Sequence, residues 1–138
     1  MREKFCAEVE RLGLMVSSLG LVAARAAYSG ACDEWLSDLR NYLTANRDFI
    51  IEYVRSELPG LRTTVPEATY LVWLDCNEPI RTGRINGSPQ AYFLEKARVA
   101  LEEGSTFGAT GEGFVRLNFA CPRSVLEEGL SRIRKSLI

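Results

Sequence analysis

GFVRLNFACPR, at residues 113–123, combines the pattern of a β-strand with a positive charge in its interior. Successive side chains of a strand point to opposite faces, so the odd positions share one face and the even positions share the other. The odd face is apolar and is predicted to pack on helices; it carries Val115, Leu117, Phe119 and Cys121. The even face must meet solvent, another domain or a ligand; it carries Phe114, Arg116, Asn118 and Ala120.

Arg116 is the candidate binding residue of this strand. A guanidinium is costly to bury unless it is paired with an anion, so Arg116 needs a partner. The pattern alone leaves two interpretations: an ion pair with a surface carboxylate, which is the commoner case, or a bidentate clamp for the carboxylate of a ligand. A phosphate-binding loop is not favoured, because the glycine-rich loop 104–113 precedes a strand and does not open a helix. The adjacent acids Glu102 and Glu103 point in different directions and are predicted to be solvated.

The second half of the chain predicts an α+β fold. Residues 69–76 form a β-branched and aromatic strand after Pro66, and residues 77–88 are a polar surface loop. Ser88 and Pro89 open a helix to about Ala97, and a short strand, RVALE, follows it. Ser124 and Glu127 form a capping box for the last helix. This order predicts a two-layer small domain, with a mainly antiparallel sheet of roughly three to four strands and helices on one face.

Helical periodicity dominates the first half. Residues 2–12 and 18–28 predict two short helices, and residues 33–58 carry an apolar stripe that Pro59 and Gly60 end. At 1.5 Å per residue the third helix is roughly 40 Å long, about the diameter of a small domain, so its two halves are expected to belong to different packing units.

Composition excludes several classes of function. The net charge is −1 with 17 basic and 18 acidic residues, which gives no electrostatic footprint for nucleic acid, and no apolar run is long enough to cross a membrane. The absence of histidine removes the commonest general base and metal ligand. The 4 cysteines have no C-x-x-C spacing and are expected to be reduced, so no metal site is predicted. The start of the chain has no secretory pattern, and we expect a cytoplasmic protein.

Three ordered runs resemble one enzyme family. VPEATYLVWLD (65–75), KARVALEEGSTFG (96–108) and GFVRLNFACPRSVLEEGLSRI (113–133) resemble the C-terminal part of the fold-type I, pyridoxal-phosphate (PLP)-dependent class I/II aminotransferases. The run LVAARAAYSGACDEWLSDLRNYLTANRDFI (21–50) is similar to the segment that links the large and small domains in the cystathionine β-lyase, or carbon–sulfur lyase, branch.

The resemblance implies a domain organisation and a binding residue. Residues 1–32 would be a remnant of the large PLP-binding domain, 33–60 the linking helix and 61–138 the C-terminal small domain. The arginine of the family's R-L-N motif binds the α-carboxylate of the amino-acid substrate, and that position is Arg116. Arg25 and the long basic loop 77–88 depart from the family pattern and leave the fine specificity open.

The resemblance also implies a cofactor that this chain is not expected to hold alone. In the family a lysine forms a Schiff base with PLP, but Lys4, Lys96 and Lys135 do not stand in the family's Ser-x-x-Lys context. We therefore expect this chain to contain no catalytic, cofactor-binding or metal-binding residue and to be inactive alone. The expected missing partner is an N-terminal large domain. The resemblance also suggests a homodimer. The alternative function is a stand-alone module that binds small carboxylates, or serves in assembly, without catalysis.

Overall fold

The computed structural model describes residues 1–138, which form two compact units, Met1–Leu39 and Arg40–Ile138. Helix α3 (Asp33–Glu57) begins in the first unit and ends in the second. Its buried residues, Asn46, Ile50 and Val54, all belong to the second unit. The boundary between the two units therefore falls within this helix.

The first unit consists of helices without a core of their own. Helices α1 (Arg2–Arg11) and α2 (Ser18–Ala27) contain no buried residue. Ser17 caps α2, because its Oγ accepts a hydrogen bond of 3.3 Å from the backbone N–H of Gly20. Large apolar side chains lie exposed along this unit: Phe5, Leu12, Leu14, Met15, Val16, Leu19, Leu21, Val22, Tyr28, Trp35 and Leu36. Isolated helices of this length are marginal in water, so their stability depends on packing against another surface.

The second unit contains the predicted antiparallel sheet. Its strands are β1 (Arg62–Thr63), β2 (Leu71–Asp75), β3 (Glu102–Glu103) and β4 (Phe114–Asn118). The spatial order is β1-β2-β4-β3, and every neighbouring pair is antiparallel. The α+β prediction is thus confirmed. Strand β1 was not predicted. Strand β3 is shorter than the expected strand at 98–102 and begins at its last residue, and Arg98 instead ends the preceding helical turn with a left-handed backbone conformation, φ 57°.

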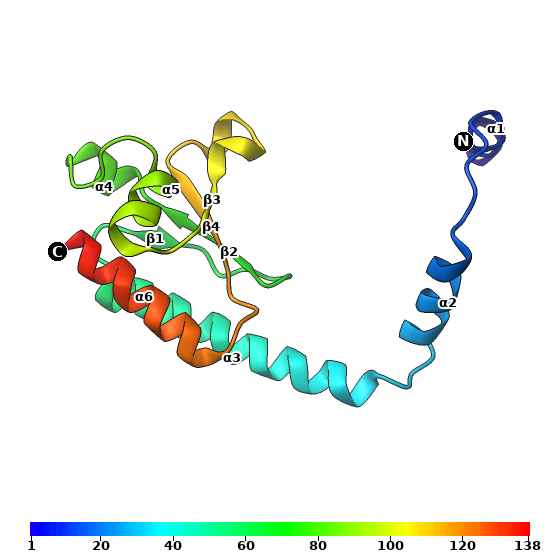
Figure 1. Cartoon of the computed structure of the whole chain (residues 1–138), viewed down its shortest axis with the longest axis horizontal. Helices are drawn as coiled ribbons and strands as arrows, with labels where there is room; N and C mark the ends of the chain where they lie inside the picture. The colour runs from blue at the N-terminus through cyan, green and yellow to red at the C-terminus, as the bar shows by residue number, and fades with distance from the viewer. The chain divides into compact units, whose positions relative to one another are not determined.

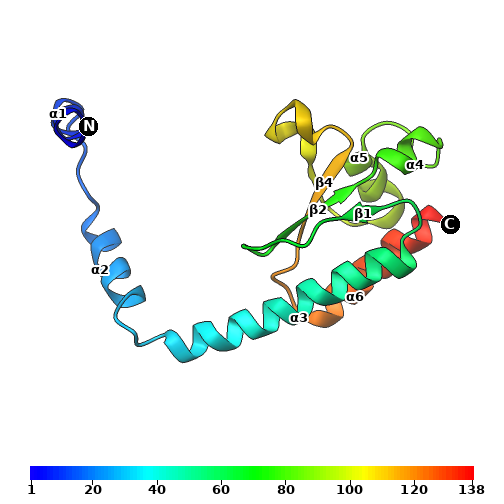
Figure 2. The same ribbon diagram turned by 180° about the vertical axis from the view of Figure 1, so that it is seen from behind.

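Two helices cover the core face of the sheet. Helix α6 (Arg123–Leu137) runs alongside α3, as both views show (Figures 1 and 2), and Arg134 of α6 pairs with Glu57 of α3 at 3.2 Å. The odd face of β4 is buried as predicted, with Val115 at 0% and Leu117 at 6% exposure. It joins the apolar stripe of α6, which is Leu126, Leu130, Ile133 and Leu137.

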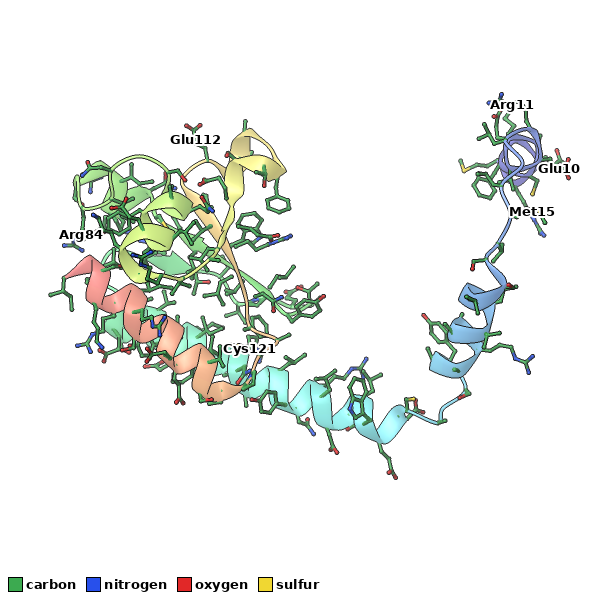
Figure 3. All side chains as sticks on the ribbon, viewed as in Figure 1. Glu10, Arg11, Met15, Arg84, Glu112 and Cys121 are labelled. Carbon is green, nitrogen blue, oxygen red and sulfur yellow. The ribbon has the colours of Figure 1, made fainter.

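Asn46 ties α3 to the connection between β4 and α6. Its side-chain amide donates hydrogen bonds of 3.1 Å to the carbonyls of Phe119 and Cys121, although these residues are far away in sequence. Figure 3 shows Cys121 at this connection. Asn46 is fully buried, and its Oδ1 atom has no hydrogen-bond partner. This one side chain therefore fixes the path of the chain just beyond the strand that carries Arg116.

The helix at 89–97 begins as predicted but changes its geometry. Ser88 is the N-cap, and its Oγ accepts a hydrogen bond of 3.2 Å from the backbone N–H of Ala91. The helix starts as α5 (Pro89–Tyr92) and continues as a π-helical turn, η1 (Phe93–Ala97). The buried Phe93 and Ala97 join it to the core.

The segment 77–88, expected to be a surface loop, contains helix α4 (Asn77–Arg81) and two buried residues. Pro79 is tolerated in the first turn of α4 because backbone N–H groups there have no hydrogen-bond acceptor within the helix. Ile85 is 1% exposed. The backbone N–H groups of Arg84 and Ile85 both donate to the carbonyl of Pro79. The polar composition hid this local packing.

The predicted capping box at Ser124 and Glu127 is wrong. Helix α6 already begins at Arg123, after Pro122, and has no side-chain cap of its own. Instead the backbone N–H of Arg123 donates a 2.7 Å hydrogen bond to the Tyr42 hydroxyl on α3. A tertiary contact thus satisfies a helix-end donor that a local cap was expected to bind.

Candidate carboxylate-binding site

Arg116 lies in the middle of a row of side chains that crosses the non-core face of the sheet. The strand register places Trp73 of β2 opposite Arg116, and Glu102 of β3 opposite Arg116 on its other side. Directly opposite residues of antiparallel strands lie close enough for their side chains to interact. The three residues therefore come together through sheet register, although they are far apart in the sequence.

The guanidinium of Arg116 is held on two sides. Its Nε donates to Oε2 of Glu102 at 2.6 Å, and its Nη2 donates to the same oxygen. Its carbon Cζ lies 4.2 Å from the centre of the Phe107 ring, a cation–π contact. The Arg116 side chain is 23% exposed, against 59% for Glu102. In this structure Arg116 thus has the surface-carboxylate partner that the first interpretation predicted.

One edge of the guanidinium stays free. Glu102 uses the Nε–Nη2 edge with a single oxygen, and Nη1 has no hydrogen-bond partner. The Nη1–Nη2 edge, which can hold a carboxylate bidentately, therefore remains unused. Figure 3 shows the side chains around this part of the sheet as sticks. The Arg116 guanidinium is therefore held in one orientation, is paired with the Glu102 carboxylate, and has hydrogen-bond donors available on its Nη1–Nη2 edge.

A turn-rich loop carries Phe107 to this place. The loop consists of the 3₁₀ turns η2 (Gly104–Phe107) and η3 (Ala109–Gly111), and Thr106 Oγ1 donates to the carbonyl of Glu103 at 2.7 Å. The backbones of Gly104 and Gly111 approach so closely that a Cβ on either one would collide with the carbonyl oxygen of the other. The glycines of this loop therefore serve close backbone packing, and this packing positions an aromatic ring over Arg116.

Aromatic rings border the arginine on the β2 side. Trp73 and Phe107 meet edge to face, with ring centres 5.4 Å apart and planes at 89°. Trp73 and Phe114 make a similar contact at 6.4 Å. Such pairs prefer edge-to-face geometry, and they stiffen the surroundings of the cation.

Two hollows adjoin this row. One, of about 360 Å³, is lined by Tyr70, Leu71, Ala100, Glu102, Arg116 and Asn118. The other, of about 410 Å³, lies on the aromatic side and is lined by Thr64, Trp73, Phe107, Thr110, Gly111 and Phe114. A further groove of about 610 Å³, between residues 98–101 and α6, does not include Arg116. The first hollow is therefore the one that places a small ligand against the guanidinium.

Sequence reasoning identified Arg116 but missed its neighbours. Glu102 and Glu103 do point in different directions, as predicted, but neither is simply solvated: Glu102 binds Arg116, and Glu103 accepts a hydrogen bond from the Ser88 hydroxyl. Phe107 and Trp73 were not singled out. The cross-strand register and the fold of the glycine loop bring these groups together, and neither can be read from strand alternation alone.

Two reactive residue types, a lysine and a buried cysteine, are held in their protonated forms in this chain. A Schiff-base lysine needs an amine that loses its proton readily, but Lys96 donates a 2.7 Å hydrogen bond to Glu95. This hydrogen bond and the negative charge of Glu95 raise the pKa of Lys96. Burial, reinforced by the charges of Asp75 and Glu103, raises the pKa of the Cys76 thiol to about 12, so this thiol is no nucleophile. No group of acidic, cysteine or histidine residues is placed to hold a metal ion.

No helix of the chain has the length and apolarity that crossing a membrane requires.

Comparison with known proteins relates the chain to one enzyme family. No family model matches it. Its sequence is 36% identical to the cystathionine β-lyase PatB of Bacillus subtilis over 137 residues, which are 99% of this chain and 34% of PatB. It is 40% identical to the protein MalY of Escherichia coli over 115 residues, 83% of this chain and 28% of MalY. The chain thus spans about a third of the length of the curated relatives it matches.

Solved structures give the same relationship. The PLP-bound C–S lyase of Staphylococcus hominis matches with a TM-score of 0.84 and 32% identity, covering 94% of this chain and 34% of that protein. A PLP-dependent β-cystathionase of Corynebacterium diphtheriae matches with a TM-score of 0.80 and 38% identity, covering 95% of this chain and 35% of that one. The homologues that cover this chain are cystathionine β-lyases and PLP-dependent C–S lyases and aminotransferases, and the chain matches a C-terminal fragment of a fold-type I, PLP-dependent enzyme.

Proposed function

We propose that this chain is the substrate-carboxylate-binding portion of a PLP-dependent cystathionine β-lyase-like enzyme or aminotransferase that acts on amino acids. In this proposal the guanidinium of Arg116 binds the substrate α-carboxylate through its free Nη1–Nη2 edge. The observation that carries the proposal is that this edge has no partner, while Glu102 and Phe107 hold the rest of the group. A charge-assisted hydrogen bond of this kind contributes about 1.5 to 3 kcal/mol.

The role of Arg116 is orientation as much as affinity. A bidentate carboxylate contact fixes both the position and the rotation of the amino acid, and so fixes the direction of the bonds at its α-carbon. Phe107 and Trp73 support this role, because their edge-to-face contact restricts the ring that lies over the guanidinium. PLP, the cofactor bound in the S. hominis relative, supplies the electron sink in such enzymes.

The proposal assigns no catalysis to this chain alone. The only amines on its side chains belong to Lys4, Lys96 and Lys135, and Lys96 is held as an ammonium by Glu95. We infer that the Schiff-base lysine is contributed by a large domain that packs against this chain. The exposed apolar side chains of α1 and α2 support such a partner, since short helices depend on packing against another surface for their stability. Assembly as a homodimer is part of the same proposal.

The carboxylate site can be tested on the chain itself. Titration with sodium propionate, followed by two-dimensional NMR of the arginine side-chain Nε–H groups, should shift the Arg116 signal and leave other arginines unchanged. Arg116→Lys keeps the charge but loses the planar fork. Because it also loses the Arg116 Nε–H signal, its affinity is read from the backbone amide signals of β4, and binding should weaken by about 10-fold or more. Arg132, paired with Glu128 on α6, provides the matched control: Arg132→Lys should bind like the unaltered chain. Equal binding by Arg116→Lys would refute the assignment.

The absence of cofactor chemistry needs a separate experiment. The chain is incubated with stoichiometric PLP, reduced with borohydride and mapped by peptide analysis. We expect no stoichiometric adduct on any lysine, and a single fully modified lysine would overturn the proposal that the Schiff base lies elsewhere.

The alternative function is a carboxylate-binding or assembly module without catalysis. One observation favours it: the cation, its supporting ring and the adjoining hollow all lie within this chain. Mixing the chain with an N-terminal portion of a relative that carries the lysine separates the two functions. Recovery of lyase or aminotransferase activity that Arg116→Lys lowers supports the enzyme part, whereas carboxylate binding without recovered activity supports the module.

A further inference from the structure

We propose that Glu102 is a built-in competitor of the substrate carboxylate at Arg116, and that its displacement sets the affinity of the site; this inference rests on the proposed function. Glu102 supplies the same functional group that a ligand would bring. It is attached to the strand beside the clamp, directly opposite Arg116 in the register of β3 and β4. One edge of the guanidinium is therefore occupied by a carboxylate before any ligand arrives, and only the Nη1–Nη2 edge is free.

The geometry of the Glu102–Arg116 ion pair allows a ligand carboxylate to replace Glu102. Glu102 engages Nε and Nη2 of Arg116 with one oxygen only, Oε2, so the contact is less complete than a two-oxygen fork. An incoming carboxylate can reach the Nη1–Nη2 edge while Glu102 is still bound. The two anions would then share Nη2 and repel each other, which favours release of the weaker one.

Glu102 is free to move away from Arg116. Its side chain is 59% exposed, and Arg116 is its only hydrogen-bond and ion-pair partner. Its neighbour Glu103 differs, because it accepts a hydrogen bond from the Ser88 hydroxyl and lies opposite Val115, not Arg116. Release of Glu102 therefore breaks one contact and returns a carboxylate to water.

Arg116, in contrast, keeps its place when Glu102 leaves. The Phe107 ring lies over the guanidinium, and this ring is fixed by Trp73 and by the packed glycine loop. The pair is thus asymmetric, with a fixed cation and a mobile anion. This asymmetry makes Glu102 a residue that sets affinity and selectivity: small anions with a single weak contact fail to displace it, and a carboxylate that makes the full fork succeeds.

Partly exposed ion pairs have stabilities that correspond to roughly a 1.5- to fivefold effect on a competing equilibrium. Glu102→Gln removes the charge and keeps the size and shape of the side chain, so it should tighten carboxylate binding by about this factor. Glu103→Gln is the matched control, because it makes the same chemical change at the next residue of β3, away from Arg116. It should leave the affinity unchanged.

The experiment uses the 138-residue chain and its two variants, titrated with sodium propionate at constant ionic strength against sodium chloride. The Arg116 Nε–H signal, assigned by its loss in Arg116→Lys, reports binding, and backbone amide spectra confirm that each variant is folded. A dissociation constant lowered about 1.5- to fivefold by Glu102→Gln alone supports the inference. Unchanged or weaker binding by Glu102→Gln overturns it while the proposed function stands. If neither the chain nor Glu102→Gln binds propionate at Arg116, the proposed function itself is refuted, and this inference with it.

Discussion

Removal of the Asn46 side-chain amide should destabilise the second unit by about 2 kcal/mol. Asn46→Ala deletes two hydrogen bonds of 3.1 Å and leaves the carbonyls of Phe119 and Cys121 without this donor. Each such bond contributes about 0.5 to 1.5 kcal/mol, and a buried acceptor left unpaired adds to the loss. Two effects act in the other direction: alanine favours the helix by roughly 0.5 kcal/mol, and the unpartnered Oδ1 of Asn46 disappears.

The assay is urea unfolding followed by Trp73 fluorescence in a Trp35→Phe background, since the chain has 2 tryptophans. Asn41 is the matched control, because it lies on the same helix and is exposed. Asn41→Ala should be neutral or slightly stabilising through helix propensity alone. If Asn46→Ala and Asn41→Ala differ by less than about 0.5 kcal/mol, the two hydrogen bonds do not hold the connection between β4 and α6.

Asn46→Asp provides a second measurement with a distinct pH dependence. A carboxylate at this position would be buried against two carbonyl oxygens, so burial would raise its pKa above that of an ordinary aspartate. A raised pKa means that the folded state favours the protonated form. The loss of stability relative to Asn46→Ala should therefore grow as the pH rises above about 4, and a pH-independent loss would contradict this reasoning.

Other predictions test the core, the loop and a buried thiol. Leu130→Ala, at a fully buried position of α6, should cost about 2 to 5 kcal/mol in urea unfolding, while the exposed Val125→Ala should cost less than about 1. Gly111→Ala forces a Cβ into the backbone of Gly104, so it should lower the free energy of unfolding by about 1 to 3 kcal/mol and alter the fluorescence of Trp73. In Gly129→Ala the Cβ meets nothing within 4 Å, so this variant should stabilise α6 by about 0.5 to 1 kcal/mol. Cys76, with a thiol pKa raised by burial to about 12, should resist iodoacetamide at pH 8 in the folded chain, while the exposed Cys6 and Cys32 react; labelling of all three at similar rates would show that the core is open. Because the raised pKa favours the neutral thiol in the folded state, the contribution of Cys76 to stability should be lost as the pH rises above about 9.

Strand alternation predicted the two faces of β4 correctly, because the period of two is a local property of extended backbone. The same holds for the Ser88 cap and for the apolar stripe of α6, where local spacing decides which side chains share a face. The capping box at Ser124 failed for a physical reason: Tyr42, far away in the sequence, satisfies the backbone N–H of Arg123. The α4 helix was hidden for a similar reason, since Pro79 and Ile85 become buried only through packing on the rest of the unit.

Periodicity and ordered motifs were sufficient to predict the α+β class, the antiparallel sheet, the family and the candidate arginine. The surroundings of Arg116 could not be predicted in this way. The register of β3 against β4 brings Glu102 to one edge of the guanidinium, and the contact between Gly104 and Gly111 folds Phe107 over it. Register and loop closure depend on the whole sheet, and a shift of one residue would turn these side chains to the other face.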